Sequence, residues 1–200
     1  GTAPQPNVAD TVPTASDMRL ARQFQRSFLP HVPDRLNGVR MLAEYHPAFE
    51  VGGDFYDLIH LDEDRFIVVM GDVSGKGISA ALIMSRLISE FRVAAHRGLR
   101  PEEILAEVNA FVAGIDFDLA FVTATVVEVS VSKRTIAIAN AGHVPAIARR
   151  ETGSAVAMFG DASGAPLGLL DDEQYVCDVH RFEAGDIVLL VTDGITEVLE

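Results

Sequence analysis

Three aspartates in this chain have the residue type and the setting that metal-assisted chemistry needs. Asp54 follows the glycine pair of GGDFYD, Asp72 lies in GDVSGKG, and Asp193 ends the apolar run DIVLLVTD just before another glycine. Carboxylate oxygens are ligands that hard divalent cations prefer, and neighbouring glycines let backbone and substrate approach closely. Spacing alone leaves a structural role equally open for each acid, because Asp193, for example, could simply cap a helix formed by ITEVLE.

The glycine-rich turn around Lys76 does not fit a nucleotide-binding loop. A P-loop requires the pattern GxxxxGK followed by Ser or Thr, because its backbone amides wrap the phosphates and its hydroxyl reaches magnesium. Here Gly71 and Gly75 enclose only three residues, and Gly77 follows Lys76 where the hydroxyl residue should stand. The carboxylate of Asp72 would also repel a triphosphate unless metals intervened. Spacing and charge both argue against nucleotide binding.

The segment GGDFYDLIHLDEDRFIVVMGD predicts a β-hairpin that turns at Glu63. If the strands pair symmetrically about Glu63, Asp54 lies directly opposite Asp72, with Cα atoms about 4.5–5.5 Å apart. Two carboxylates that close are costly unless a cation lies between them. The same register places Asp57 on the opposite face, which predicts a structural role for it. A slip of one residue would remove the pairing.

The N-terminal segment predicts a linker followed by a helix. Residues 1–15 carry three prolines among small polar residues, which indicates a linker or disordered lead-in. Ser16 is the expected N-cap of a helix that ends before the proline at position 30. Leu20, Phe24 and Phe28 lie on one face of this helix. Such a stripe most often packs into a core, but after a linker it could also couple the domain to a preceding module.

The rest of the chain predicts an α+β fold. Helical patterns run from Ile78 to about Arg97 and from Pro101 to about Val112. The second pattern has an acidic first turn, which is typical of a helix start. The later strand-like segments are FVTATVVEVS, TIAIANA, VPAIAR, YVCDVHRF and DIVLLVT. No second crossover helix separates them. That order argues against a doubly wound parallel sheet and favours stacked antiparallel sheets with helices outside.

Composition narrows the class of protein. The 200 residues fit one compact domain, and the 29 acidic against 16 basic residues give a formal charge of −13, which argues against nucleic-acid binding. The longest stretch without charged residues, 135–148, is shorter than the roughly 18 apolar residues that a membrane helix needs. No secretory signal is recognisable, and the single Cys177 suits a reducing compartment. We therefore expect a cytoplasmic protein without membrane insertion.

Five motifs, taken together, resemble a known family. GGDFYD, GDVSGKGISAA, NAGHVPA, GAPLG and TDGITE occur in the order found in SpoIIE/RsbU-like phosphatases of the PPM family, the metal-dependent (type-2C) protein serine/threonine phosphatases. The similarity runs from about residue 18 to the end, and ARQFQRSFLP resembles the helix that leads into these domains. It implies an αββα sandwich of two stacked antiparallel sheets flanked by helices. The expected division is a lead-in (1–15), a coupling helix (16–29) and a phosphatase domain (30–200).

The resemblance also implies a metal site and a mechanism. Two Mn²⁺ or Mg²⁺ ions are expected, held by Asp54, Asp72, Asp193 and the backbone carbonyl of Val73, with Asp72 bridging both ions. A metal-activated water would then hydrolyse phosphoserine or phosphothreonine without a phosphoenzyme. The loop glycines Gly71, Gly75 and Gly77 would let the chain turn around the ions, with Ser74 and Lys76 at the rim.

His143, in the motif NAGHVPA, has three roles open to it: proton donor, extra metal ligand, or a hydrogen bond that fixes a loop. We favour the third. Family members normally continue with a helix and a strand that carries one more metal-binding acid, whereas this sequence ends at Glu200. We therefore expect a domain shortened at its C-terminus with one metal site incomplete. The alternative function is a catalytically weak or inactive signalling or binding module of the same fold.

Two other phosphatase chemistries fit poorly. Cysteine phosphatases need an arginine six positions after the cysteine, where this chain has Glu183 after Cys177. The segment FVAGIDFDLA, with Asp116 and Asp118, approaches the HAD-type pattern but has Leu119 at the Thr/Val position. The family resemblance implies a phosphorylated STAS-type anti-sigma-factor antagonist as substrate and an upstream sensory or receiver domain as regulator.

Overall fold

The computed structural model describes residues 14–47, 51–75, 77–115, 121–151, 156–160 and 164–195. The helices are α1 (Ala15–Phe28), α2 (Ile78–His96) and α3 (Pro101–Ala113), and a short 3-10 turn, η1, spans Asp193–Ile195. The larger sheet contains β3 (Asp54–His60), β4 (Arg65–Val73), β5 (Val122–Ser130), β6 (Thr135–Ala141) and β9 (Cys177–Arg181). The smaller sheet contains β10 (Ile187–Leu189), β7 (Ala146–Arg149) and β8 (Val156–Phe159), and β1 (Arg35–Leu36) pairs with β2 (Val39–Arg40).

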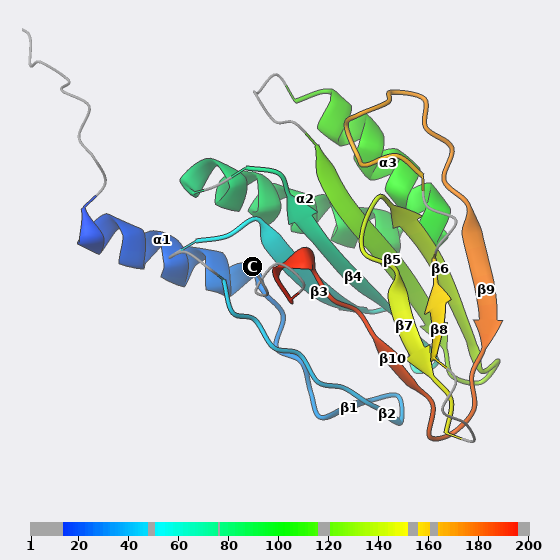
Figure 1. Cartoon of the computed structure of the whole chain (residues 1–200). Coiled ribbons are helices and arrows are strands. Elements are labelled where there is room, and N and C mark those ends of the chain that lie inside the picture. The colour runs from blue at the N-terminus through cyan, green and yellow to red at the C-terminus, as the bar shows by residue number, and fades with distance from the viewer. Residues whose placement is uncertain are drawn as a thin grey trace, which may run out of the picture.

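The two sheets stack with helices on one side, as Figure 1 shows. Every strand pair within them is antiparallel. Helices α2 and α3 cover the outer face of the five-stranded sheet, where Phe91 and Ile104 are fully buried. The opposite face packs against the smaller sheet through a second apolar cluster that includes Phe66 and Phe159. The predicted α+β fold of stacked antiparallel sheets is confirmed; in the described part of the chain, helices cover only the larger sheet.

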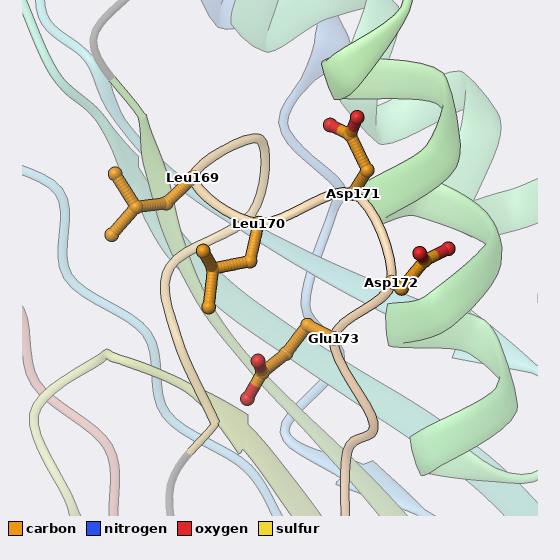
Figure 2. A pocket seen from close by; sticks show the side chains of 5 residues that line it. All are labelled: Leu169, Leu170, Asp171, Asp172 and Glu173. Atoms are coloured by element: carbon orange, nitrogen blue, oxygen red, sulfur yellow. The ribbon is translucent and has the colours of Figure 1, made fainter.

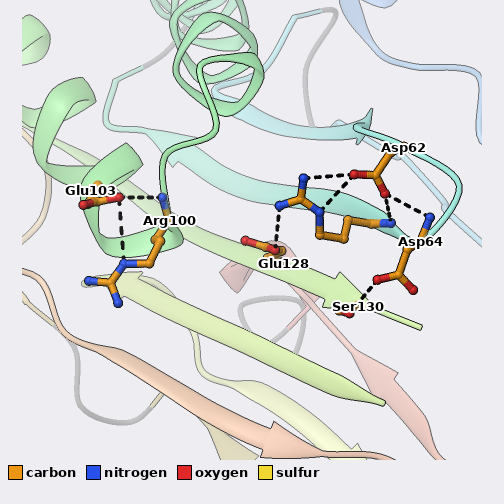
Figure 3. A network of polar contacts seen from close by, with 7 residues as sticks. Asp62, Asp64, Arg100, Glu103, Glu128 and Ser130 are labelled. Carbon is orange, nitrogen blue, oxygen red and sulfur yellow. Dashed lines mark hydrogen bonds and ion pairs between the residues drawn. The ribbon is translucent and has the colours of Figure 1, made fainter. Parts of the chain in front are cut away.

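The β3–β4 hairpin has the predicted register. Asp54 pairs with Asp72, and the pairing continues in step to the other end of the strands. The turn is held by Asp62, whose Oδ1 accepts hydrogen bonds from the backbone amides of Asp64 (2.9 Å) and Arg65 (2.8 Å). Asp64 in turn accepts from the hydroxyl of Ser130 on β5 (2.8 Å; Figure 3). These contacts fix the turn, and thereby the register at the far end.

Helix α1 differs from the prediction in two respects. Its N-cap is Thr14 rather than Ser16, because the Thr14 side chain accepts from the amide of Asp17 and the Asp17 carboxylate accepts from the amide of Thr14 in return. The apolar stripe is also not its buried face: Leu20 is 67% exposed and Phe24 55% exposed. The one fully buried side chain of the helix is polar, Gln25, at 2% exposure.

Helices α2 and α3 lie where the sequence predicts them. The first ends at His96, two residues before Gly98, whose left-handed conformation suits a glycine after a helix, and the second begins at Pro101. The predicted strands are also present; β6 has the predicted bounds and the other four of the later strands are shorter, whereas β8 and the β1–β2 hairpin were not predicted. No helix among the described residues is long and apolar enough to cross a bilayer.

Candidate metal centre

Three carboxylates converge at one end of the space between the two sheets. Asp54 begins β3, Asp72 lies one residue before the end of β4, and Asp193 opens the turn η1 that follows β10. Each offers an oxygen within 4.8 Å of the others. In Figure 1 the red η1 turn accordingly lies beside the start of β3. Asp54 and Asp72 are half-buried and Asp193 is exposed, so the cluster is open to solvent on one side.

The alternation along the strands explains why these acids share a face. Phe55 and Val73, the strand neighbours of Asp54 and Asp72, point into the core beneath the helices. Successive side chains of a strand point to opposite faces, so the two aspartates point toward the smaller sheet. The approach of Asp193 depends instead on the tertiary packing of β10 beside β7.

Gly53 shows that oxygen atoms crowd the space beside the cluster. A Cβ atom built on Gly53 would lie 2.3 Å from the carbonyl oxygen of Val73 and 2.6 Å from Oδ1 of Asp72. The amide of Val73 also donates to the carbonyl of Gly53 (3.2 Å), which holds the two strand ends together. Three carboxylates and a nearby carbonyl are an all-oxygen donor set of the kind that Mg²⁺ and Mn²⁺ prefer. The residues present therefore fit a hard divalent cation.

The glycine-rich loop joins this site to α2. Gly71 lies within β4, where a Cβ would come within 2.5 Å of the Thr123 carbonyl oxygen. Gly75 and Gly77 adopt positive φ angles of 118° and 79°, which side chains rarely tolerate. Ser74, expected at the rim, donates its amide to the Phe121 carbonyl (3.0 Å) and accepts from the Phe121 amide at its hydroxyl oxygen (2.9 Å). Lys76 lies outside the described residues, as do Asp116 and Asp118 of the HAD-like segment.

His143 lies beside the cluster and is 6% exposed. Its Nδ1 shares a hydrogen bond of 2.9 Å with Oγ1 of Thr123, the residue on β5 that pairs with Asp72. Burial lowers the pKa of the imidazole to about 4, while the Val191 carbonyl and the Asp193 carboxylate oppose that shift. The ring is therefore neutral near pH 7.

Tyr45 is a site neighbour that the sequence analysis missed. Its hydroxyl is buried without a hydrogen-bond partner in the described part of the chain. Burial is the main cause that raises the pKa of Tyr45 to about 12, and the charge of Asp54 adds to it. Tyr45 belongs to no periodic run and precedes the GGD motif by several residues, so nothing in its spacing indicated this position.

Helix α1 contacts the strand that carries Asp54. The Gln25 side chain donates from Nε2 to the Gly52 carbonyl (2.5 Å) and accepts from the Gly52 amide at Oε1 (3.2 Å). On the helix-covered face of β3, the fully buried Asp57 accepts two hydrogen bonds from Arg92 of α2 (2.7 and 2.9 Å). Arg92 also donates to the Phe28 carbonyl at the end of α1 (3.1 Å). Asp57 is thus a structural residue.

A cavity of about 480 Å³ lies apart from the cluster of Asp54, Asp72 and Asp193. Figure 2 shows that its lining side chains all come from one loop beside α3, the residues Leu169, Leu170, Asp171, Asp172 and Glu173. Asn109 of α3 holds this loop by donating to the Leu170 carbonyl (2.8 Å). The candidate site is located by the converging oxygens rather than by this cavity.

The chain is similar in sequence and fold to known proteins. The family model described as stage II sporulation protein E (SpoIIE) matches residues 62–200. The phosphoserine phosphatase RsbP of Bacillus subtilis is 28% identical over 190 residues, which cover 92% of this chain and 46% of that protein. The phosphoserine phosphatase RsbU of the same organism is 27% identical over 183 residues, covering 91% of this chain and 54% of that protein.

Among solved structures, the SiaA-PP2C domain of Pseudomonas aeruginosa superposes with a TM-score of 0.73 at 24% identity, covering 90% of this chain and 71% of that one. At this identity the likeness concerns the fold. The chain spans about half the length of the curated relatives that it matches.

Proposed function

The chain belongs to the SpoIIE family of PPM-type phosphatase domains, and on that premise we propose that it is a metal-dependent protein serine/threonine phosphatase. The observation that carries the proposal is the convergence of Asp54, Asp72 and Asp193, whose oxygens lie within 4.8 Å of one another. Carboxylates so close repel one another unless a cation neutralises them. Because Asp193 is exposed, a phosphoryl group on a protein surface can reach the cluster.

The three aspartates and the Val73 carbonyl would hold the Mn²⁺ or Mg²⁺ ions, of which the family resemblance implies two. When bound, such cations stabilise negative charge on a phosphoryl group and activate water near neutral pH. The chain's own residues have defined tasks. Asp72 supplies a carboxylate opposite Asp54 on the paired strand, with Asp193 on η1 close to both. Gly53 leaves space for the Asp72 and Val73 oxygens to lie next to each other.

The proposed substrate is a phosphoserine or phosphothreonine on a signalling protein, and more specifically on a STAS-type anti-sigma-factor antagonist. Support for phosphoserine comes from the relatives RsbP and RsbU, both named phosphoserine phosphatases. The STAS-type class follows from the family resemblance. We also propose a cytoplasmic location for this domain.

For the division of the chain, we propose that residues 16–29 form a coupling helix between an upstream sensory or receiver domain and the phosphatase domain that begins at residue 30. Two contacts support this. Gln25 bonds to Gly52, two residues from Asp54. Arg92 connects the end of the helix to Asp57 on the same strand. Polar replacements of Phe24 and Phe28 should uncouple activity from the upstream domain; unchanged regulation would contradict this role.

The test of the enzymatic proposal is the rate of p-nitrophenyl phosphate and phosphoserine-peptide hydrolysis across a Mn²⁺ titration. Asp72→Asn should reduce the rate to the metal-free background. The matched control is Glu63→Gln, which also neutralises a carboxylate of the same hairpin, at the exposed turn far from the cluster, and it should leave the rate unchanged. Thermal unfolding in EDTA checks that both variants fold. A wild-type chain without a Mn²⁺-dependent rate would contradict the proposal and favour a binding module of the same fold.

A further inference from the structure

We propose that His143 is a positioning residue, whose ring connects the strand beside Asp72 to the segment that carries Asp193 and thereby sets the spacing of the carboxylate cluster. The inference rests on the proposed metal site. It assigns His143 a task distinct from proton donation to the substrate and from metal ligation.

The backbone of His143 is held rigidly. The Asn140 side chain accepts from the His143 amide at Oδ1 (2.7 Å) and donates from Nδ2 to the His143 carbonyl (2.9 Å). The same Nδ2 donates to the Gly160 carbonyl (3.0 Å), beside the end of β8. Asn140 is 1% exposed, so water does not compete for these bonds. The imidazole therefore starts from a fixed point between the two sheets.

One ring nitrogen of His143 is hydrogen-bonded to the residue that pairs with Asp72. The 2.9 Å contact joins Nδ1 to Oγ1 of Thr123, and Thr123 is the β5 residue paired with Asp72. Any shift of the ring relative to β5 would break this bond. The ring position is thus tied to β5, the strand that pairs with β4 at Asp72.

The other side of the ring faces the segment of the third carboxylate. Nε2 is fully buried and has no hydrogen-bond partner among the described residues. The groups that act on the ring from this segment are the Val191 carbonyl and the Asp193 carboxylate. When the Thr123 hydroxyl donates to Nδ1, the neutral ring carries its proton on Nε2 and can donate only there.

An unsatisfied buried donor costs about 1–3 kcal/mol, so an approach of the Val191 carbonyl to Nε2 is favoured. Because Asp193 follows Val191 by two residues, that interaction would hold the segment that carries Asp193 beside Asp54 and Asp72. Hydrogen bonds that orient metal ligands typically change metal affinity by about 10–100-fold when they are removed. His143 should therefore act on the affinity for the cation even though it need not touch it.

Two conservative substitutions of His143 distinguish the role of Nδ1 from the role of Nε2. His143→Asn can replace the Nδ1 contact with Thr123 but is too short to reach the Val191 segment. His143→Gln extends its amide to about the position of Nε2. Mn²⁺ binding to the full 200-residue chain would be measured without substrate by calorimetry and by the EPR signal of free Mn²⁺. His60→Ala is the control, because His60 is exposed at the other end of β3.

We expect His143→Asn to weaken Mn²⁺ binding by at least tenfold, His143→Gln to remain within about threefold of the wild type, and His60→Ala to bind normally. Thermal unfolding in EDTA identifies a variant that fails to fold; if His143→Asn does so, His143→Ser, which is also too short to reach the Val191 segment, should show the same tenfold loss. Equal affinities of the Asn and Gln variants would overturn the inference. A wild type that does not bind Mn²⁺ would overturn the metal site itself, and this inference with it.

Discussion

Replacing Gly53 with alanine should separate the strand ends that carry Asp54 and Asp72. The added Cβ would lie 2.3 Å from the Val73 carbonyl oxygen and 2.6 Å from Oδ1 of Asp72. Both are backbone or short side-chain atoms at the ends of paired strands, and neither can swing away like the tip of a long side chain. The Val73 carbonyl must retreat by about 0.7 Å before the contact is tolerable.

The expected magnitude follows from that displacement. Overpacking of this kind costs about 1–3 kcal/mol of folding free energy, and the weakened amide bond from Val73 to Gly53 adds to it. The effect on the site should be larger in relative terms, because a misplacement of about 1 Å can cost about 100-fold in rate. We therefore expect the affinity for Mn²⁺ and the metal-dependent hydrolysis rate to fall at least tenfold, with a modest decrease in stability.

The neighbouring glycine is a matched control. A Cβ on Gly52 would meet Pro47 Cβ at 3.4 Å and Tyr45 Oη at 3.6 Å, which are ordinary van der Waals distances. Gly52→Ala also leaves intact the backbone groups that Gln25 contacts. The two variants differ by one position in the same segment, so urea denaturation and Mn²⁺ calorimetry on the pair isolate the crowding at Gly53. Equal Mn²⁺ affinities of the two variants would refute the reasoning.

Three further predictions concern the surroundings of the site. Arg92→Met leaves Asp57 buried without its ion-pair partner and should lower the free energy of unfolding by about 3 kcal/mol. Urea denaturation measures this loss. We expect the low end of the range for buried pairs because the Arg92 side chain is 41% exposed. Gln25→Leu leaves the amide and carbonyl of Gly52 without their partner. It should lower the free energy of unfolding by about 1–3 kcal/mol and reduce the hydrolysis rate. Gln23→Leu, at an exposed position of the same helix, should change neither quantity. In EDTA, the free energy of unfolding should rise as pH increases from about 4 to 6.5. Over this range the buried His143 stays neutral in the folded chain, whereas the same histidine binds a proton in the unfolded chain. The rise should approach about 3 kcal/mol and disappear in His143→Gln.

Each of these has a contradicting outcome. A wild-type urea midpoint for Arg92→Met would mean that water replaces the guanidinium at Asp57. Equal losses from Gln25→Leu and Gln23→Leu would mean that the helix, rather than its contact with β3, sets activity. If His143→Gln keeps the pH dependence of stability between 4 and 6.5, other groups cause it.

The sequence by itself was sufficient for the β3–β4 hairpin and for the pairing of Asp54 with Asp72. The reason is local: the two strands are joined by a short turn, and a side-chain period of two allows only one register that buries the apolar face. The bounds of α2 and α3 were predictable for a similar reason, since Gly98 and Pro101 act through their own backbone preferences.

The buried face of α1 could not be inferred in this way. Its apolar stripe predicted Leu20 and Phe24 as contacts, yet the helix buries Gln25, because the backbone of Gly52 offers a donor and an acceptor in the right positions. A polar side chain is buried when a distant segment satisfies it. No pattern within the helix records where that segment lies.

The third carboxylate and the residues around the cluster were also decided by tertiary structure. A motif placed Asp193 in the site only through a family resemblance; its approach to Asp72 requires β10 to pair with β7 and the two sheets to stack. The contact of His143 with Thr123 and the burial of the Tyr45 hydroxyl also depend on segments that lie far apart in the sequence. Sequence periodicity determines which face of a strand a side chain occupies, whereas the packing of remote segments determines what that side chain meets.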